Sequence, residues 1–105
     1  MDDRRLEQAL QALSRALTAS RAPWMVIGGI AIIAHGVRRF TTDIDAAVHG
    51  DAIRPEELLE IFESHGIEPR IRNAASFARE NLVLLLRHRA TGVDLDVSFA
   101  WSADA

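Results

Sequence analysis

The sequence predicts an α/β (α+β) fold in which a mixed, twisted sheet is flanked by helices, within a single domain that covers residues 1–105. Two observations predict it. Residues 2–20 carry a leucine stripe with the period of a helix, and residues 93–99 alternate apolar and polar side chains with the period of a strand. Between them, short apolar runs alternate with turns that contain glycine or proline. A chain of 105 residues buries enough surface for one core and leaves no room for a second.

The first element is expected to be a helix over Asp2–Ser20. Its stripe consists of Leu6, Leu10, Leu13 and Leu17, with Ala9 and Ala16 beside it. These leucines share one face of a helix with a period of 3.6 residues. Pro23 prevents the helix from continuing. We expect this helix to cover one face of the sheet.

Two strands are expected in the next part of the chain. Trp24–Ile27 is short and uniformly apolar, which favours a buried strand, and Gly28–Gly29 then allows a tight turn. Residues 30–35 are expected to form a short helix and residues 37–42 a loop. Asp43–Val48 is expected to be the second strand.

A further helix is expected to begin at Pro55, because proline suits the first turn of a helix, and to end at His65–Gly66. After it, we expect a short strand at Arg70–Arg72 and a turn at Asn73.

The last expected unit is a hairpin. The apolar run Leu82–Leu86 fits either a strand or a helix by itself. It is followed by the glycine-containing loop 90–92 and then by Val93–Phe99, which alternates cleanly. Two adjacent strands joined by such a loop make a hairpin the most economical interpretation.

Two Asp-x-Asp pairs are the candidates for chemistry. Asp43 and Asp45 leave the same face of the second strand, about 7 Å apart at the backbone, and Asp94 and Asp96 repeat this arrangement on the last strand. Carboxylates so close together repel each other unless a cation lies between them. Mg²⁺ is suited to this role, because it takes one or two carboxylates and completes its shell with water and phosphate oxygens. If the two strands are neighbours, a third carboxylate joins the cluster and a second metal can be held, as in two-metal phosphoryl transfer.

The glycine pair fits a phosphate site. Gly28 and Gly29 open a helix directly after a strand, where backbone N–H groups and the helix dipole favour an anion. Arg38 or Arg39 could neutralise a further phosphate oxygen.

Residues 24–48 resemble the signature of the nucleotidyltransferase superfamily related to DNA polymerase beta. The residues that carry the resemblance are the double glycine after a strand and the later run R-x-T-x-D-I-D. They are similar to the branch that contains minimal nucleotidyltransferases and the nucleotidyltransferase toxins of bacterial toxin–antitoxin and phage-abortive systems. The run V-D-L-D-V-S-F-A resembles the family's later strand, so the similarity extends from Trp24 to Trp101.

The resemblance implies a nucleotidyltransferase fold and a metal-dependent transfer of a nucleoside monophosphate from a nucleoside triphosphate to a hydroxyl of RNA, protein or a small molecule. By the resemblance, Asp43 and Asp45 bind two Mg²⁺ ions, with Mn²⁺ as an alternative. The third metal ligand is Asp96 or Asp94, of which Asp96 is favoured by the residues that follow it. By the resemblance, Gly28 and Gly29 contact the triphosphate. With Arg38, Arg39 and Thr42 they make up the candidate nucleotide-binding residues.

Most members of that superfamily continue beyond the last strand into helices that bind the acceptor. We therefore expect a minimal enzyme, a piece of a longer chain, or one half of a two-chain complex with an antitoxin or a helical partner protein.

Composition narrows the classes of function. The net charge of -3 argues against a general nucleic-acid-coating surface, whereas all twelve basic residues are arginine, which suits local phosphate contacts. The absence of cysteine excludes disulfides and thiolate metal sites and makes a cytoplasmic location the default expectation. No apolar run is long enough to span a membrane.

Two other functions stay open at this point. A catalytically inactive nucleotidyltransferase-fold module would bind a partner, for example as an antitoxin. A metal-dependent nuclease would use the same carboxylates without any nucleoside triphosphate.

Overall fold

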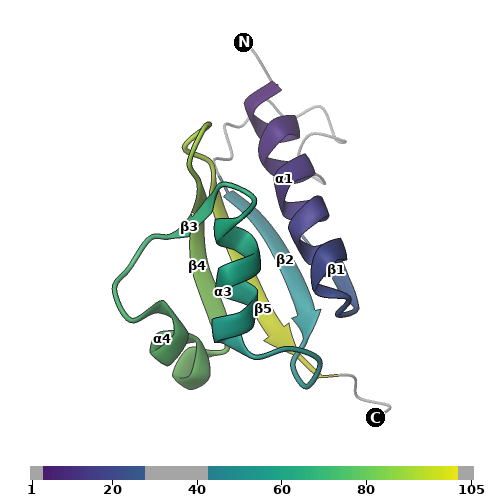
Figure 1. The fold of residues 1–105 in the computed structure, drawn as a ribbon, viewed down its shortest axis with the longest axis vertical. Helices are drawn as coiled ribbons and strands as arrows, with labels where there is room; N and C mark the ends of the chain where they lie inside the picture. Colours follow the sequence, from purple (N-terminus) through teal and green to yellow (C-terminus); the bar gives the residue numbers. More distant parts are fainter. Residues whose placement is uncertain (1–3, 28–42, 102–105) are drawn as a thin grey trace.

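A computed structural model describes residues 4–27 and 43–101. Within them the fold is mixed α+β, with a five-stranded sheet and three helices (Figure 1). In chain order the elements are α1 (Arg4–Ser20), β1 (Trp24–Val26), β2 (Asp43–His49), α3 (Pro55–Glu63), β3 (Ile67–Pro69), α4 (Ala74–Asn81), β4 (Val83–His88) and β5 (Asp94–Ala100). The turn, short helix and loop expected between residues 28 and 42 lie outside the described residues.

The sheet is mixed, as expected. Its strand order is β1-β2-β5-β4-β3. β2 and β5 run parallel, and the other neighbouring pairs run antiparallel. β4 and β5 form the hairpin that the sequence predicted, with Leu86 opposite Leu95. This order makes β2 and β5 interior strands that lie side by side.

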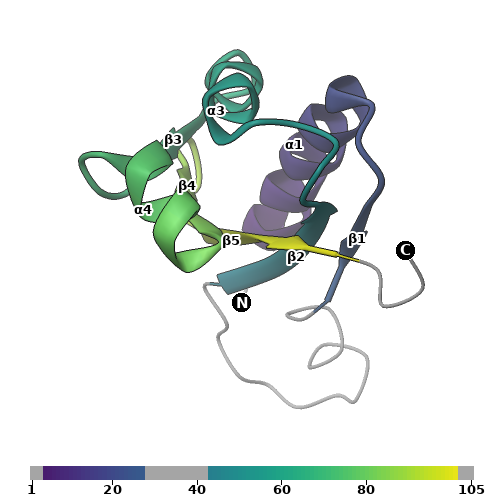
Figure 2. The same cartoon turned by 90° about the horizontal axis from the view of Figure 1, so that it is seen from below.

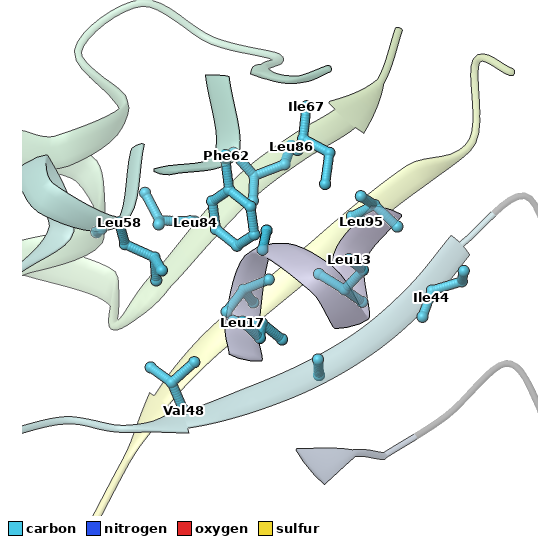
Figure 3. Packing of buried hydrophobic residues seen from close by; sticks show 14 of the residues in the cluster. Leu13, Leu17, Ile44, Val48, Leu58, Phe62, Ile67, Leu84, Leu86 and Leu95 are labelled. Carbon is cyan, nitrogen blue, oxygen red and sulfur yellow. The ribbon is translucent and has the colours of Figure 1, made fainter. Parts of the chain in front are cut away.

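Helices α1 and α3 cover one face of the sheet, as Figure 2 shows from the end of the molecule. The core lies between these helices and the sheet (Figure 3), where Leu13 and Leu17 of α1 and Phe62 of α3 are fully buried. The sheet contributes Ile44 and Leu95 to the same core. None of the helices in the described ranges is long and apolar enough to cross a membrane.

The buried face of α1 differs from the predicted leucine stripe. Leu13 and Leu17 are buried as expected, but Leu6 and Leu10 are only partly buried. Ala9 and Ala16 are fully buried instead, because small side chains allow the helix to approach the sheet closely. The buried stripe is therefore rotated toward the alanines.

The prediction of a buried first strand was wrong. Among the described strands, β1 lies at the edge of the sheet and pairs with β2 alone. Met25 is 62% exposed and Ile27, just after the strand, is 60% exposed. An apolar run therefore indicated a strand without indicating how much of it is covered.

The region between α3 and β4 was also predicted incorrectly. The strand is Ile67–Pro69 rather than Arg70–Arg72, and the helix α4 was not foreseen. The expected turn at Asn73 is present, with a left-handed backbone (φ 57°), directly before α4. α4 buries only Ala74 and Ala78, so its apolar signal in the sequence is weak.

Candidate functional site

The structure brings the two Asp-x-Asp pairs together. In the parallel pairing of β2 with β5, Asp43 lies opposite Asp94 and Asp45 lies opposite Asp96. Neighbouring strands are separated by about 4.8 Å and alternate residues of one strand by about 7 Å, so the four residues form a compact rectangle at the beginnings of two interior strands. We call these four residues the aspartate cluster. The condition for a third carboxylate to join the first pair, that the two strands are neighbours, is thus met.

The aspartate cluster lies on the sheet face opposite α1 and α3. Ile44 and Leu95 alternate with the aspartates and are fully buried against the helices. Asp43 and Asp45 are exposed, and Asp94 and Asp96 are partly buried. Strand alternation therefore separates the acidic side chains from the core on the other face.

Arg70 contacts the cluster and was not identified from the sequence. Its Nη2 donates a hydrogen bond to Oδ1 of Asp96 at 2.8 Å, and its Nη1 lies 3.4 Å from Oδ2 of Asp94. The Arg70 side chain is only 18% exposed. No motif in the sequence points to this residue, because the contact joins positions 26 residues apart.

The backbone explains how Arg70 reaches Asp96. Its N–H donates to the carbonyl of Leu85 at 2.9 Å, which continues the β3–β4 ladder by one residue. Leu85 is in turn the register partner of Asp96. The guanidinium therefore extends across one strand to the aspartate on the next.

The two aspartates of β5 differ in their partners. Asp94 also accepts a hydrogen bond from Nε of Arg87 at 3.1 Å, so two arginines contact it. Asp96 is contacted by Arg70 alone among the described residues.

Asp45 lies in a negative electrostatic environment. Although the residue is exposed overall, its carboxyl loses part of its hydration, which raises its pKa above the ordinary value, and the negative charges of Asp96 and Asp43 raise that pKa further. Within the described residues no ion pair joins Asp45 to an arginine. A positive ligand near Asp45 would relieve this cost.

The donor type fits a hard divalent cation, since carboxylate oxygens are the ligands that Mg²⁺ prefers. The positions of the side chains fit less well. In residues 4–27 and 43–101, no three acidic or histidine side chains are grouped so that they could hold a metal ion as they stand. The contact of Asp96 with Arg70 occupies one oxygen that such a group would need.

No model of a protein family and no curated protein matches this chain. The features of this chain that point to a function are therefore the geometry of the aspartate cluster and the sequence motif that contains Asp43 and Asp45.

The expected nucleotide-binding residues Gly28, Gly29, Arg38, Arg39 and Thr42 lie outside the described residues. Ile27, the described residue directly before Gly28, is hydrogen-bonded to the backbone of the strand that carries Asp45. The N–H of Ile27 donates to the backbone carbonyl of Asp45 at 2.7 Å.

A shallow apolar hollow of about 330 Å³ lies at the other end of β2 and β5. Met25, Ala47 and Trp101 are among the residues that line it. Trp101 is 47% exposed and its indole N–H donates to Asp51 at 2.9 Å. Ala47 is two residues from Asp45, which corresponds to about 7 Å along the strand.

Proposed function

We propose that this chain is a nucleotidyltransferase-fold enzyme that transfers a nucleoside monophosphate from a nucleoside triphosphate to an acceptor hydroxyl, with release of pyrophosphate. One observation carries the proposal: the in-register pairing of Asp43 and Asp45 with Asp94 and Asp96 on the sheet face away from the helices. The acceptor class is RNA, a protein or a small molecule.

The pairing supports the proposal because the sequence alone does not determine it. The motif contains both Asp-x-Asp runs, but only the fold brings together two strands whose aspartates are some 50 residues apart. Desolvation raises the pKa of Asp45, and the negative charges of Asp96 and Asp43 raise it further, so part of the shift comes from like charges gathered at this place. Such a place favours a divalent cation that arrives with a triphosphate.

In this proposal Asp43, Asp45 and Asp96 hold the metal ions, Mg²⁺ or Mn²⁺. When bound, the metal ions supply positive charge that stabilises the phosphate oxygens during an in-line displacement. Asp96 is favoured over Asp94 as the third ligand, because one arginine contacts Asp96 whereas two contact Asp94.

The chain's own residues would orient the reactants and move one proton. Arg70 bonds Oδ1 of Asp96, so Oδ2 is the oxygen proposed to accept the proton of the acceptor hydroxyl. The hydroxyl oxygen then forms the new bond to the α-phosphorus as the bond to the pyrophosphate oxygen breaks. Gly28 and Gly29 are proposed to contact the triphosphate, since the chain enters Gly28 from Ile27, which is hydrogen-bonded to Asp45.

The apolar hollow is a candidate site for the nucleoside. Its volume of about 330 Å³ falls at the lower end of small-molecule sites. It lies about 7 Å or more from Asp45 along β2, which is within reach of the nucleoside of a triphosphate bound at the cluster.

The second candidate is a catalytically inactive module of the same fold that binds a nucleotide or a partner protein. The contact between Arg70 and Asp96 favours this candidate, because an arginine already neutralises part of the charge that a metal ion would neutralise.

Incubation of the purified chain with α-labelled nucleoside triphosphates, Mg²⁺ or Mn²⁺ and RNA or protein acceptors tests the first function. We expect label transfer that falls by more than about 100-fold in Asp43→Asn and Asp45→Asn, because loss of a residue that merely supports a metal ligand costs about 10–100-fold. Glu60→Gln is the control, since it also removes one carboxylate but Glu60 is exposed on α3, which covers the other face of the sheet. Nucleotide binding without transfer to any acceptor would favour the inactive module.

A further inference from the structure

Among the arginines with a described contact to the aspartate cluster, Arg70 has the least exposed side chain. Its side chain is 18% exposed, whereas that of Arg87, which contacts Asp94, is 48% exposed. The two terminal nitrogens of Arg70 contact two aspartates of the same strand face. The backbone hydrogen bond to Leu85 fixes the point from which the side chain extends.

We propose that Arg70 is a built-in counter-ion of the cluster, which positions Asp96 and competes electrostatically with a divalent cation for it. This inference depends on the proposed function, because it assigns Asp96 to the metal site. Arg70 would stabilise the carboxylates in the absence of metal and would lower the metal affinity of the site.

The arrangement of charges leads to this role. Four carboxylates share a small area, and the positive charges of Arg70 and Arg87 lie against the two that belong to β5. An arginine bound to Oδ1 of Asp96 holds that carboxylate in one orientation and keeps a positive charge beside it. The same positive charge repels an incoming divalent cation. The absence of a three-ligand group among the described side chains is consistent with this competition.

The direct test compares Mn²⁺ binding to the wild-type chain, Arg70→Gln and Arg89→Gln at neutral pH and about 0.1 M salt, by electron paramagnetic resonance of free Mn²⁺. Arg89→Gln is the matched control: it also removes one positive charge and two carboxylate contacts, but those contacts are to Glu63 and Glu68 outside the cluster. We expect Arg70→Gln to bind Mn²⁺ about three- to tenfold more tightly, from the repulsion between a unit charge and a divalent ion roughly 6 Å apart with and without salt screening. Arg89→Gln should stay within about twofold of the wild type, because Arg89 contacts Glu63 and Glu68 rather than an aspartate of the cluster, and salt at about 0.1 M screens charges that are not in contact.

Two further measurements separate charge from structure. Arg70→Lys keeps the charge, so its Mn²⁺ affinity should remain near that of the wild type, whereas a purely steric role would make it resemble Arg70→Gln. In the unmodified chain, titration with Mg²⁺ should shift the side-chain Nε–H resonance of Arg70 and leave that of Arg89 in place. This second measurement requires no substitution and holds even if Arg70→Gln does not fold.

The outcomes distinguish the two proposals. If the wild type binds Mn²⁺ and folded Arg70→Gln binds it equally or more weakly, the counter-ion role is overturned and the proposed function stands. If the chain binds Mg²⁺ but the Nε–H resonance of Arg70 does not shift, the counter-ion role is likewise overturned and the proposed function stands. If neither the wild type nor Arg70→Gln binds Mn²⁺, both proposals fail. Binding by Arg70→Gln alone supports the counter-ion role and argues against a metal-loaded wild type.

Discussion

Replacement of Asp45 by asparagine should stabilise the fold while it removes the proposed activity. Partial burial and the negative charges of Asp96 and Asp43 raise the pKa of Asp45 in the folded state. A raised carboxyl pKa means that the ionised form is less favourable in the folded chain than in the unfolded chain. Asparagine has nearly the same shape and carries no charge, so the substitution removes this cost.

The size of the stability gain expected for Asp45→Asn follows from the distances between the carboxylates on the two strands. Asp43 lies about 7 Å from Asp45 along the strand, and Asp96 lies about 4.8 Å from it on the neighbouring strand. In water these distances correspond to repulsions of about 0.6 and about 0.9 kcal/mol, which screening at 0.1 M salt reduces to about 0.3 and about 0.5 kcal/mol. Together they give a gain of about 0.8 kcal/mol for Asp45→Asn. For a domain of this size that gain corresponds to a rise in Tm of about 3–6 °C.

Thermal unfolding followed by circular dichroism at pH 7 measures this gain. The sign with pH is fixed by the raised pKa: the cost of Asp45 is present at neutral pH and disappears as pH falls through its folded-state pKa, because the carboxyl is then protonated. The gain of Asp45→Asn should therefore vanish at about pH 3, below the ordinary carboxyl value of about 3.9. It should also shrink at 0.5 M NaCl, because screening becomes stronger.

Asp96→Asn is the matched control, since it makes the same chemical change on the neighbouring strand. Asp96 accepts the hydrogen bond from the poorly exposed Arg70, so its loss should destabilise the fold by about 1–2 kcal/mol. Opposite signs for the two substitutions are the essential result. A lower Tm for Asp45→Asn at pH 7 and low salt would refute the electrostatic reasoning.

Two further predictions concern the core. Burial lowers the pKa of His88, whose Nδ1 is hydrogen-bonded to the hydroxyl of Thr91 at 2.7 Å. The free energy of unfolding should therefore carry no cost from His88 above the unfolded histidine pKa of about 6.5 and should decrease as pH falls below that value. In His88→Gln this part of the pH dependence of unfolding should be absent. Leu13→Ala should reduce the free energy of unfolding by about 2–5 kcal/mol in urea titrations, because Leu13 is fully buried. Leu6→Ala should cost clearly less, since Leu6 is only partly buried; equal costs would contradict the rotated stripe of α1.

Strong local periodicity was sufficient to predict several elements. The α1 helix, the β2 strand, the start of α3 at Pro55 and the β4–β5 hairpin all occur where the sequence indicated them. In each case the signal lies within a window of a few residues, such as the clean alternation of Asp94–Ala100. α4 escaped prediction because its buried side chains are alanines, which carry little apolar signal.

The extent of burial was harder to predict than the type of element. Trp24–Ile27 was expected to be buried because it is apolar, yet it ends up at the sheet edge with Met25 exposed. The apolar pattern of a strand does not state how many neighbours the strand has. The rotation of α1 has a similar cause, since the alanines that approach the sheet are small rather than strongly apolar.

The sequence by itself determined that each Asp-x-Asp pair shares one strand face, because side chains alternate along a strand regardless of context. Only the tertiary structure decided that the two pairs lie opposite each other, since the parallel pairing of β2 with β5 joins segments separated by α3, β3, α4 and β4. It also decided that Arg70 contacts Asp96, a contact that requires β3, β4 and β5 to be neighbours in register. Local alternation can be predicted from the chain, whereas the pairing of distant strands is set by how the whole core packs.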